Sequence, residues 1–124
     1  MTNKAVTIIL ALGSNVNQEQ NINRAMEYLR HTFGDIRFSE MLWNPAIGIC
    51  SEDFLNVVAV ATTHHPPATV NASLKYIEQQ CGRTSNDKEQ NLIPLDIDLL
   101  QYDNVRYHLS DWERGYIKLL MKQI

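Results

Sequence analysis

The amino-acid sequence predicts an α+β domain whose segments follow the order β-α-β-β-α-β. Four segments have the alternating or β-branched composition of strands, two carry apolar residues at helical spacing, and glycine or proline separates most of them. The chain has 124 residues, of which 44% are apolar and 20% are charged. This is the size and composition of one globular domain, which we expect to span residues 1–124.

The N-terminal half is predicted to contain a strand, a helix and two further strands. Alternating and β-branched residues over 6–12 predict the first strand, and residues 13–15 are expected to end it in a tight turn. Apolar residues then recur at helical spacing over 18–33, before a glycine that provides a stop. Segments 36–43 and 54–63 have the composition of strands and are separated by turn-forming residues.

The C-terminal half is predicted to contain one helix, a polar loop and a last strand. The helix is expected to begin at the prolines 66–67 and to end before Gly82, because apolar residues fall at i, i+4, i+7 and i+11 from Val70. Residues 83–91 are polar and lack periodicity, so they indicate a loop, and residues 95–102 indicate a strand. The resulting order is the split βαβ pattern of ferredoxin-like domains, an antiparallel sheet with two helices packed on one face.

Charge and composition argue against several kinds of partner. The chain has 11 basic and 14 acidic residues, a net charge of -3, and no basic stripe of the kind that binds nucleic acid. The apolar run over 5–12 is much shorter than the ~18–20 residues that a membrane span requires. Cys50 and Cys81 lie in no metal-binding or redox pattern, so we expect free thiols and a cytoplasmic protein.

The strongest chemical signal is a pair of carboxylates in the last predicted strand. Asp96 and Asp98 are two residues apart in an apolar run, so strand alternation places both on one face, about 6.6 Å apart along the strand. Two like charges there favour a nearby cation, and oxygen ligands without His or Cys favour Mg²⁺, of which such a pair could hold two ions. The alternative interpretation is a pair of solvated acids on an exposed face.

Weaker signals indicate a site for a flat ring and a site for phosphate. Asn56 is the one polar amide in an apolar strand, and with Phe54 and Tyr116 it could form a slot for a planar heterocycle. His108 and Arg114 could contact phosphate as a pair. The alternatives are ordinary core residues for the first three and a solvated histidine for the last pair.

Six short stretches agree in composition and order with one known family. They are Ala11-Leu12-Gly13-Ser14-Asn15, Asn44-Pro45-Ala46-Ile47-Gly48, Asp53-Phe54-Leu55-Asn56, Glu78 with Gly82-Arg83, Leu95-Asp96-Ile97-Asp98-Leu99-Leu100, and His108 with Arg114-Gly115-Tyr116. In these stretches, from about residue 5 to 117, the chain resembles the hydroxymethyl-dihydropterin pyrophosphokinases of folate biosynthesis. The resemblance implies a transferase that moves pyrophosphate from ATP to 6-hydroxymethyl-7,8-dihydropterin and leaves AMP.

The resemblance also implies a role for individual residues. Asp96 and Asp98 are implied to bind two Mg²⁺ ions and, with Arg83, to be catalytic. The implied pterin-binding residues are Asn44, Ile47, Phe54, Asn56 and Tyr116. The implied nucleotide-binding residues are Glu78, Lys88, His108 and Arg114. The implied partners are thus the small molecules pterin and ATP, bound by a monomer or homodimer.

The loop before the paired aspartates departs from the family pattern. The family carries further arginines between Gly82 and Asp96, whereas this chain has Ile93 at one of those positions and Lys88 as the cation of the loop. We therefore expect weak ATP binding and a loop over 83–91 that stays disordered with nucleotide. Alternative functions are a divergent homologue that is weakly active or uses another phosphate donor, and a non-catalytic pterin-binding or oligomer-forming module.

Overall fold

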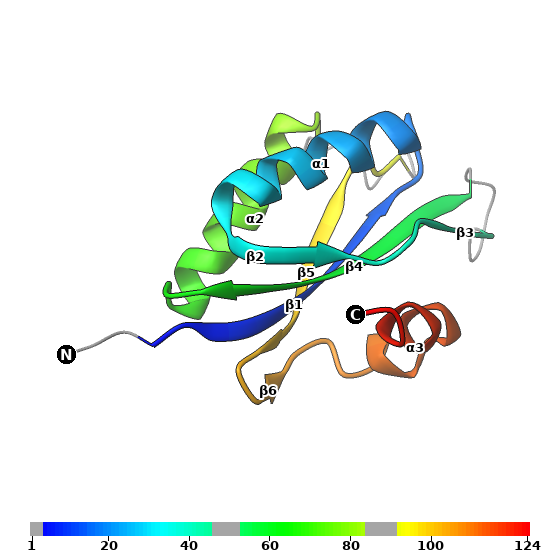
Figure 1. Cartoon of the computed structure of the whole chain (residues 1–124). Coiled ribbons are helices and arrows are strands. Elements are labelled where there is room, and N and C mark those ends of the chain that lie inside the picture. The colour runs from blue at the N-terminus through cyan, green and yellow to red at the C-terminus, as the bar shows by residue number, and fades with distance from the viewer. Residues whose placement is uncertain (1–3, 46–52, 84–91) are drawn as a thin grey trace.

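The computed structural model describes residues 4–45, 53–83 and 92–124, which form a six-stranded sheet with helices on both faces (Figure 1). The strands are β1 (Val6–Ser14), β2 (Gly34–Phe38), β3 (Leu42–Asn44), β4 (Phe54–Thr63), β5 (Asp96–Tyr102) and β6 (Val105–Arg106). The helices are α1 (Gln18–Thr32), α2 (Pro67–Gln80) and α3 (Gly115–Met121), preceded by a 3₁₀ turn at Asp111–Glu113.

Strand β1 lies at the centre of the sheet. The strand order is β2-β4-β1-β5-β6, β3 pairs with the start of β4, and all these pairings are antiparallel. Every residue of β1 has a partner on β4, and residues 8–13 also have partners on β5. This is the ferredoxin-like arrangement that the sequence predicted, with α1 and α2 side by side on one face (Figure 1).

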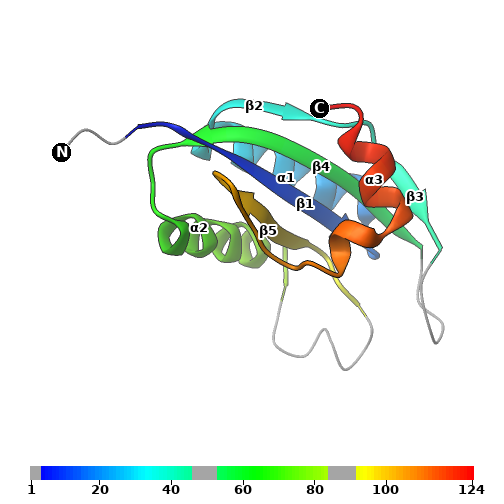
Figure 2. The same ribbon diagram turned by 90° about the horizontal axis from the view of Figure 1, so that it is seen from below.

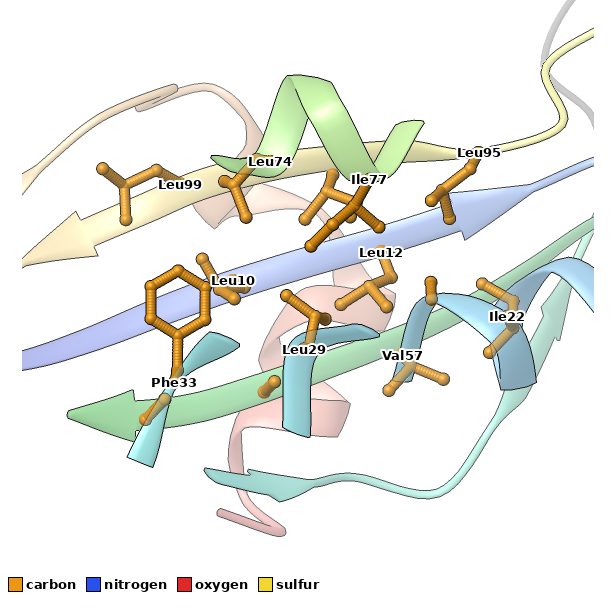
Figure 3. Close-up of a cluster of buried hydrophobic side chains, with 14 of the residues drawn as sticks. Leu10, Leu12, Ile22, Leu29, Phe33, Val57, Leu74, Ile77, Leu95 and Leu99 are labelled. Atoms are coloured by element: carbon orange, nitrogen blue, oxygen red, sulfur yellow. The ribbon is translucent and has the colours of Figure 1, made fainter. Parts of the chain in front are cut away.

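The main hydrophobic core lies between the sheet and helices α1 and α2 (Figure 3). Leu10 and Leu12 of β1 point into this core, so Ala11 and Gly13 lie on the opposite face of the strand. The helices contribute fully buried side chains, each worth about 1.5–3 kcal/mol by burial, among them Ile22, Leu29, Leu74 and Ile77. Leu10 and Leu12 thus hold the helices α1 and α2, whereas the small residues Ala11 and Gly13 lie on the other face.

The short helix α3 covers part of that other face, which the sequence analysis did not predict. Figure 2 shows α3 lying across the sheet on the side away from α1 and α2. Its Ile117 and Leu120 pack against Ile9, Val58 and Leu100. The expectation of two helices on one face is correct for α1 and α2 but incomplete. Seven residues with two buried apolar positions are too short a pattern to predict a helix.

Two predicted strand boundaries are wrong. The segment 36–43 is not one strand, because it separates into β2 and β3 at Ser39. There the Ser39 N–H donates to the Val58 carbonyl at 2.9 Å, and the Val58 N–H donates to Ser39 Oγ at 2.9 Å. A hydroxyl therefore replaces a backbone partner of the sheet. The predicted turn at 13–15 also begins later, because its first two residues still pair with β4.

Two further expectations concern membrane spans and the cysteines. Among the described residues, no helix is both long and apolar enough to cross a membrane. Cys81 is a buried free thiol, as expected, whereas Cys50 lies outside the described residues.

Candidate functional site

The small residues of β1 form the floor of a cavity of about 690 Å³ on the face that carries α3. Gly13 pairs with Asn56 of β4 on one side and with Asp96 of β5 on the other. A Cβ atom at Gly13 would lie 3.0 Å from Asn56 Nδ2 and 3.5 Å from Phe54 Cδ1. The glycine is therefore what allows the Asn56 amide and the Phe54 ring to lie over the strand.

The lining of this cavity includes two amides and two aromatic rings. Asn44 Nδ2 donates to Asn56 Oδ1 at 2.7 Å, and Asn56 Nδ2 donates to the Leu12 carbonyl at 3.3 Å. These bonds fix both amides and leave each with further hydrogen-bonding capacity. Phe54 and Tyr116 line the same cavity, and burial raises the pKa of the Tyr116 phenol. Four of the residues predicted to bind a ring therefore lie around one cavity.

A second cavity of about 400 Å³ lies beside α2 and β5. Its lining is mostly polar and includes Asn71, Lys75, Glu78, Gln79, Arg83 and His108. Asp96 and Asp98 line both this cavity and the first one. The paired carboxylates thus lie at the border between a ring-sized cavity with aromatic walls and a polar cavity with cationic side chains.

The two carboxylates have different electrostatic surroundings. Arg83 Nη1 lies 2.8 Å from Asp96 Oδ1, whereas Asp98 Oδ1 faces the imidazole of His108, with Nε2 at 3.8 Å. Burial, followed by the charge of Asp96, raises the pKa of Asp98 to about 6, and His108 opposes this shift. Two like charges on one strand face favour a nearby cation, and Arg83 provides it for Asp96.

Arg83 is positioned by the end of α2. Gly82, with φ +95°, lets the chain reverse so that the Arg83 N–H bonds the Glu78 carbonyl at 3.1 Å. Glu78 is 8% exposed, and its Oε2 accepts both Arg83 Nη1 at 3.1 Å and the Ile97 N–H at 2.8 Å. Burial raises the pKa of Glu78. Burial alone would lower the pKa of Arg83, but its bond to Asp96 and the charge of Glu78 raise it.

The remaining predicted residues make fewer direct contacts with the paired carboxylates. Arg114 and Asp111 line the first cavity, and His108 lines the second. Arg114 Nε bonds Asp111 Oδ1 at 3.0 Å, and ligand atoms of Asp98, His108 and Asp111 lie within 4.8 Å of one another. Sequence reasoning missed Asp111, although its spacing of three residues from His108 was a usable signal. Ile47 and Lys88 lie outside the described residues, as do residues 84–91 of the predicted loop.

Comparisons with known proteins show the family of the chain. Residues 9–124 match the family described as 7,8-dihydro-6-hydroxymethylpterin-pyrophosphokinase. The chain is also 29% identical, over 121 residues, to the folate synthesis bifunctional protein, mitochondrial, of Pisum sativum. That match covers 89% of this chain and 23% of the pea protein, so the chain spans less than a quarter of this relative's length.

Proposed function

Because the chain belongs to the 7,8-dihydro-6-hydroxymethylpterin-pyrophosphokinase family, we propose that it transfers pyrophosphate from ATP to 6-hydroxymethyl-7,8-dihydropterin and releases AMP. One observation carries the proposal: Asp96 and Asp98 line two different cavities at once. A transfer between two substrates needs both reacting groups at one place, and the border between the cavities is such a place.

The first cavity is the proposed pterin site. Its volume of about 690 Å³ lies in the usual range for small-molecule pockets. We infer that Phe54 and Tyr116 stack on the faces of the ring, and that the amides of Asn44 and Asn56 pair with its edge. Ring and edge contacts together select a flat heterocycle with mixed donors and acceptors.

The polar second cavity is the proposed nucleotide site. It contains the cations Lys75 and Arg83 together with His108. Positive side chains in this position favour phosphate groups. ATP bound here would bring its phosphates to Asp96 and Asp98, and pterin in the first cavity would bring its hydroxymethyl group to the same carboxylates.

The residues present fit Mg²⁺. Asp96 and Asp98 offer carboxylate oxygens, and their side chains are 40% and 31% exposed, so cations can reach them from the cavities. When bound, Mg²⁺ would neutralise phosphate charge and orient the triphosphate. The chain's own part is positioning: the aromatic and amide groups hold the pterin, and Arg83 supplies charge on the nucleotide side.

An assay of AMP release with hydroxymethyl-dihydropterin, ATP and Mg²⁺ tests the proposed reaction directly. Release that requires all three components supports it. Pterin binding without AMP release would contradict the enzymatic proposal and favour a non-catalytic pterin-binding module, for which the loss of the family's loop arginines is the supporting observation.

We expect the affinity of the free protein for Mg²⁺ to fall as the pH drops below about 6. Asp98 has a pKa raised to about 6, so its protonated form, which cannot bind a cation well, dominates below that value. The affinity should decrease by about tenfold per pH unit below the pKa. Calorimetric Mg²⁺ titrations between pH 5 and 8 measure this, and a flat profile across that range would contradict it.

Substituting Ile93→Arg is expected to tighten Mg·ATP binding by about tenfold or more, since one arginine–phosphate hydrogen bond contributes ~1.5–3 kcal/mol. The Ile93 backbone is held by Asn15, whose N–H donates to the Ile93 carbonyl at 3.0 Å and whose Oδ1 accepts the Ile93 N–H at 2.6 Å. The new side chain therefore starts from a fixed point in the lining of the first cavity, and it contacts phosphates by extending to the border that Asp96 and Asp98 form with the second cavity.

The matched control is Leu92→Arg, which adds the same charge at the neighbouring exposed residue. Calorimetry with Mg·ATP should separate the two variants. Equal tightening by both would mean that only net charge matters. Submicromolar affinity in the unmodified protein would show that other residues have replaced the family's arginines.

A further inference from the structure

Arg83 pairs with Asp96, one of the two carboxylates proposed to bind metal. Its Nη1 lies 2.8 Å from Asp96 Oδ1, 3.1 Å from Glu78 Oε2 and 3.3 Å from the Leu95 carbonyl oxygen. Three oxygens thus converge on one charged nitrogen. A guanidinium at this distance neutralises Asp96 and lowers the attraction of that carboxylate for a second cation.

Glu78 gives Arg83 an alternative partner. The Glu78 carboxylate is anchored to β5 by the Ile97 N–H at 2.8 Å, independently of Asp96. If Asp96 takes another cation, Arg83 can stay paired with Glu78, so the exchange leaves no charge without a partner. Arg83 also lines the second cavity, where a displaced guanidinium has space.

On the basis of the proposed function, we propose that Arg83 is the counter-ion of Asp96 in the metal-free protein and that a divalent cation bound by Asp96 and Asp98 displaces it into the second cavity. Displacement frees guanidinium donors on the side where the nucleotide phosphates would lie. The metal and the nucleotide then favour each other's binding, because each stabilises the same position of Arg83.

The test is the binding of Mn²⁺ alone, measured by electron paramagnetic resonance at pH 8 without pterin or nucleotide. Arg83→Gln should bind Mn²⁺ about tenfold more tightly than the unmodified protein, within the usual range of coupling between sites. Arg30→Gln removes an equal charge that pairs with Glu27 on α1 instead of Asp96, and it should change the affinity by less than about threefold. Equal tightening by both variants would overturn the exchange, because only the general field would have changed.

A double-mutant cycle isolates the direct contact. In protein that already carries Asp96→Asn, the added Arg83→Gln should no longer tighten Mn²⁺ binding, and continued tightening would overturn the proposal. If a variant fails to fold, a measurement on the unmodified protein still tests the exchange. Adding diamagnetic Mg²⁺ should shift the Arg83 side-chain resonances in ¹⁵N nuclear magnetic resonance spectra. Unchanged resonances at saturating Mg²⁺ would overturn it.

The outcomes also separate this proposal from the proposed function. Tight Mn²⁺ binding whose affinity is the same with and without Arg83→Gln would refute the exchange and still support the metal site. Absence of Mn²⁺ binding in all variants, with and without ATP, would refute the metal site and the exchange together.

Discussion

Asp98→Asn is expected to abolish Mg²⁺-dependent AMP release and to leave pterin affinity within about twofold. The substitution removes a charged ligand, and metal stabilisation of phosphoryl transfer is worth several kcal/mol, so the rate should fall by about a thousandfold or more. Asp96→Asn should have a similar effect, since both carboxylates line both cavities. The proposed pterin contacts lie on β3, β4 and α3 and carry neither of these charges.

Loss of fold is not the expected cause of that inactivity. The pKa of Asp98 is raised from 3.8 to about 6, so the folded state holds this proton more tightly than the unfolded state does. At neutral pH the ionised form therefore lowers the stability of the fold, and stability rises as the pH falls through 6. The neutral Asp98→Asn variant should unfold at a temperature no lower than that of the unmodified protein.

A matched control is Asp103→Asn, the same chemical change in the turn after β5. Asp103 has φ +55°, a left-handed conformation that asparagine tolerates, and it lines neither cavity. Its AMP release should equal that of the unmodified protein. Normal AMP release by either site variant would remove the proposed metal role of the pair.

Asn56→Ala is expected to weaken pterin binding by ~1–3 kcal/mol, which is about 5-fold to 150-fold in affinity. The truncation removes the amide proposed to pair with the ring edge, and it also removes the partner of Asn44 Nδ2 at 2.7 Å. Both losses disturb the same end of the cavity. Fluorescence titration with the pterin, well below the unfolding temperature, measures the effect.

The control for this prediction is Asn23→Ala on the exposed side of α1. It changes the same residue type at a distance from the cavity residues and should leave pterin affinity unchanged. An unchanged affinity in Asn56→Ala itself would mean that the amide pair is structural, holding β3 against β4, and that the ring is recognised elsewhere.

The parts of the fold that depend on local pattern were predictable from the sequence. The spacing of apolar residues gave α1 and α2 nearly to the residue, since a helical face needs only its own segment. The interruption at Ser39 was not predictable, because it depends on a hydroxyl meeting Val58 on another strand. The helix α3 is held by contacts with distant strands more than by its own seven residues.

In the candidate site too, features set by local pattern were predictable and features set by contacts between distant segments were not. Strand alternation predicted that Asp96 and Asp98 would share a face, and both line each of the two cavities. Their partners could not be predicted from spacing. Arg83 reaches Asp96 only because α2 ends beside β5, and Glu78 is fixed by a backbone N–H of that strand. An ion pair between two elements can be recognised only from the tertiary structure, because spacing in the sequence does not show which elements meet.

The place of Gly13 between Asn56 and Asp96 fixes the distance between the strands that carry these two residues. Each step to a neighbouring strand is about 4.8 Å, so the two residues that flank Gly13 stand about 10 Å apart, backbone to backbone. This span is set by hydrogen bonds of the central strand and cannot be adjusted by side-chain rotation. Under the proposed function, this fixed span separates the strand that would pair with the edge of the pterin from the strand that carries the two carboxylates.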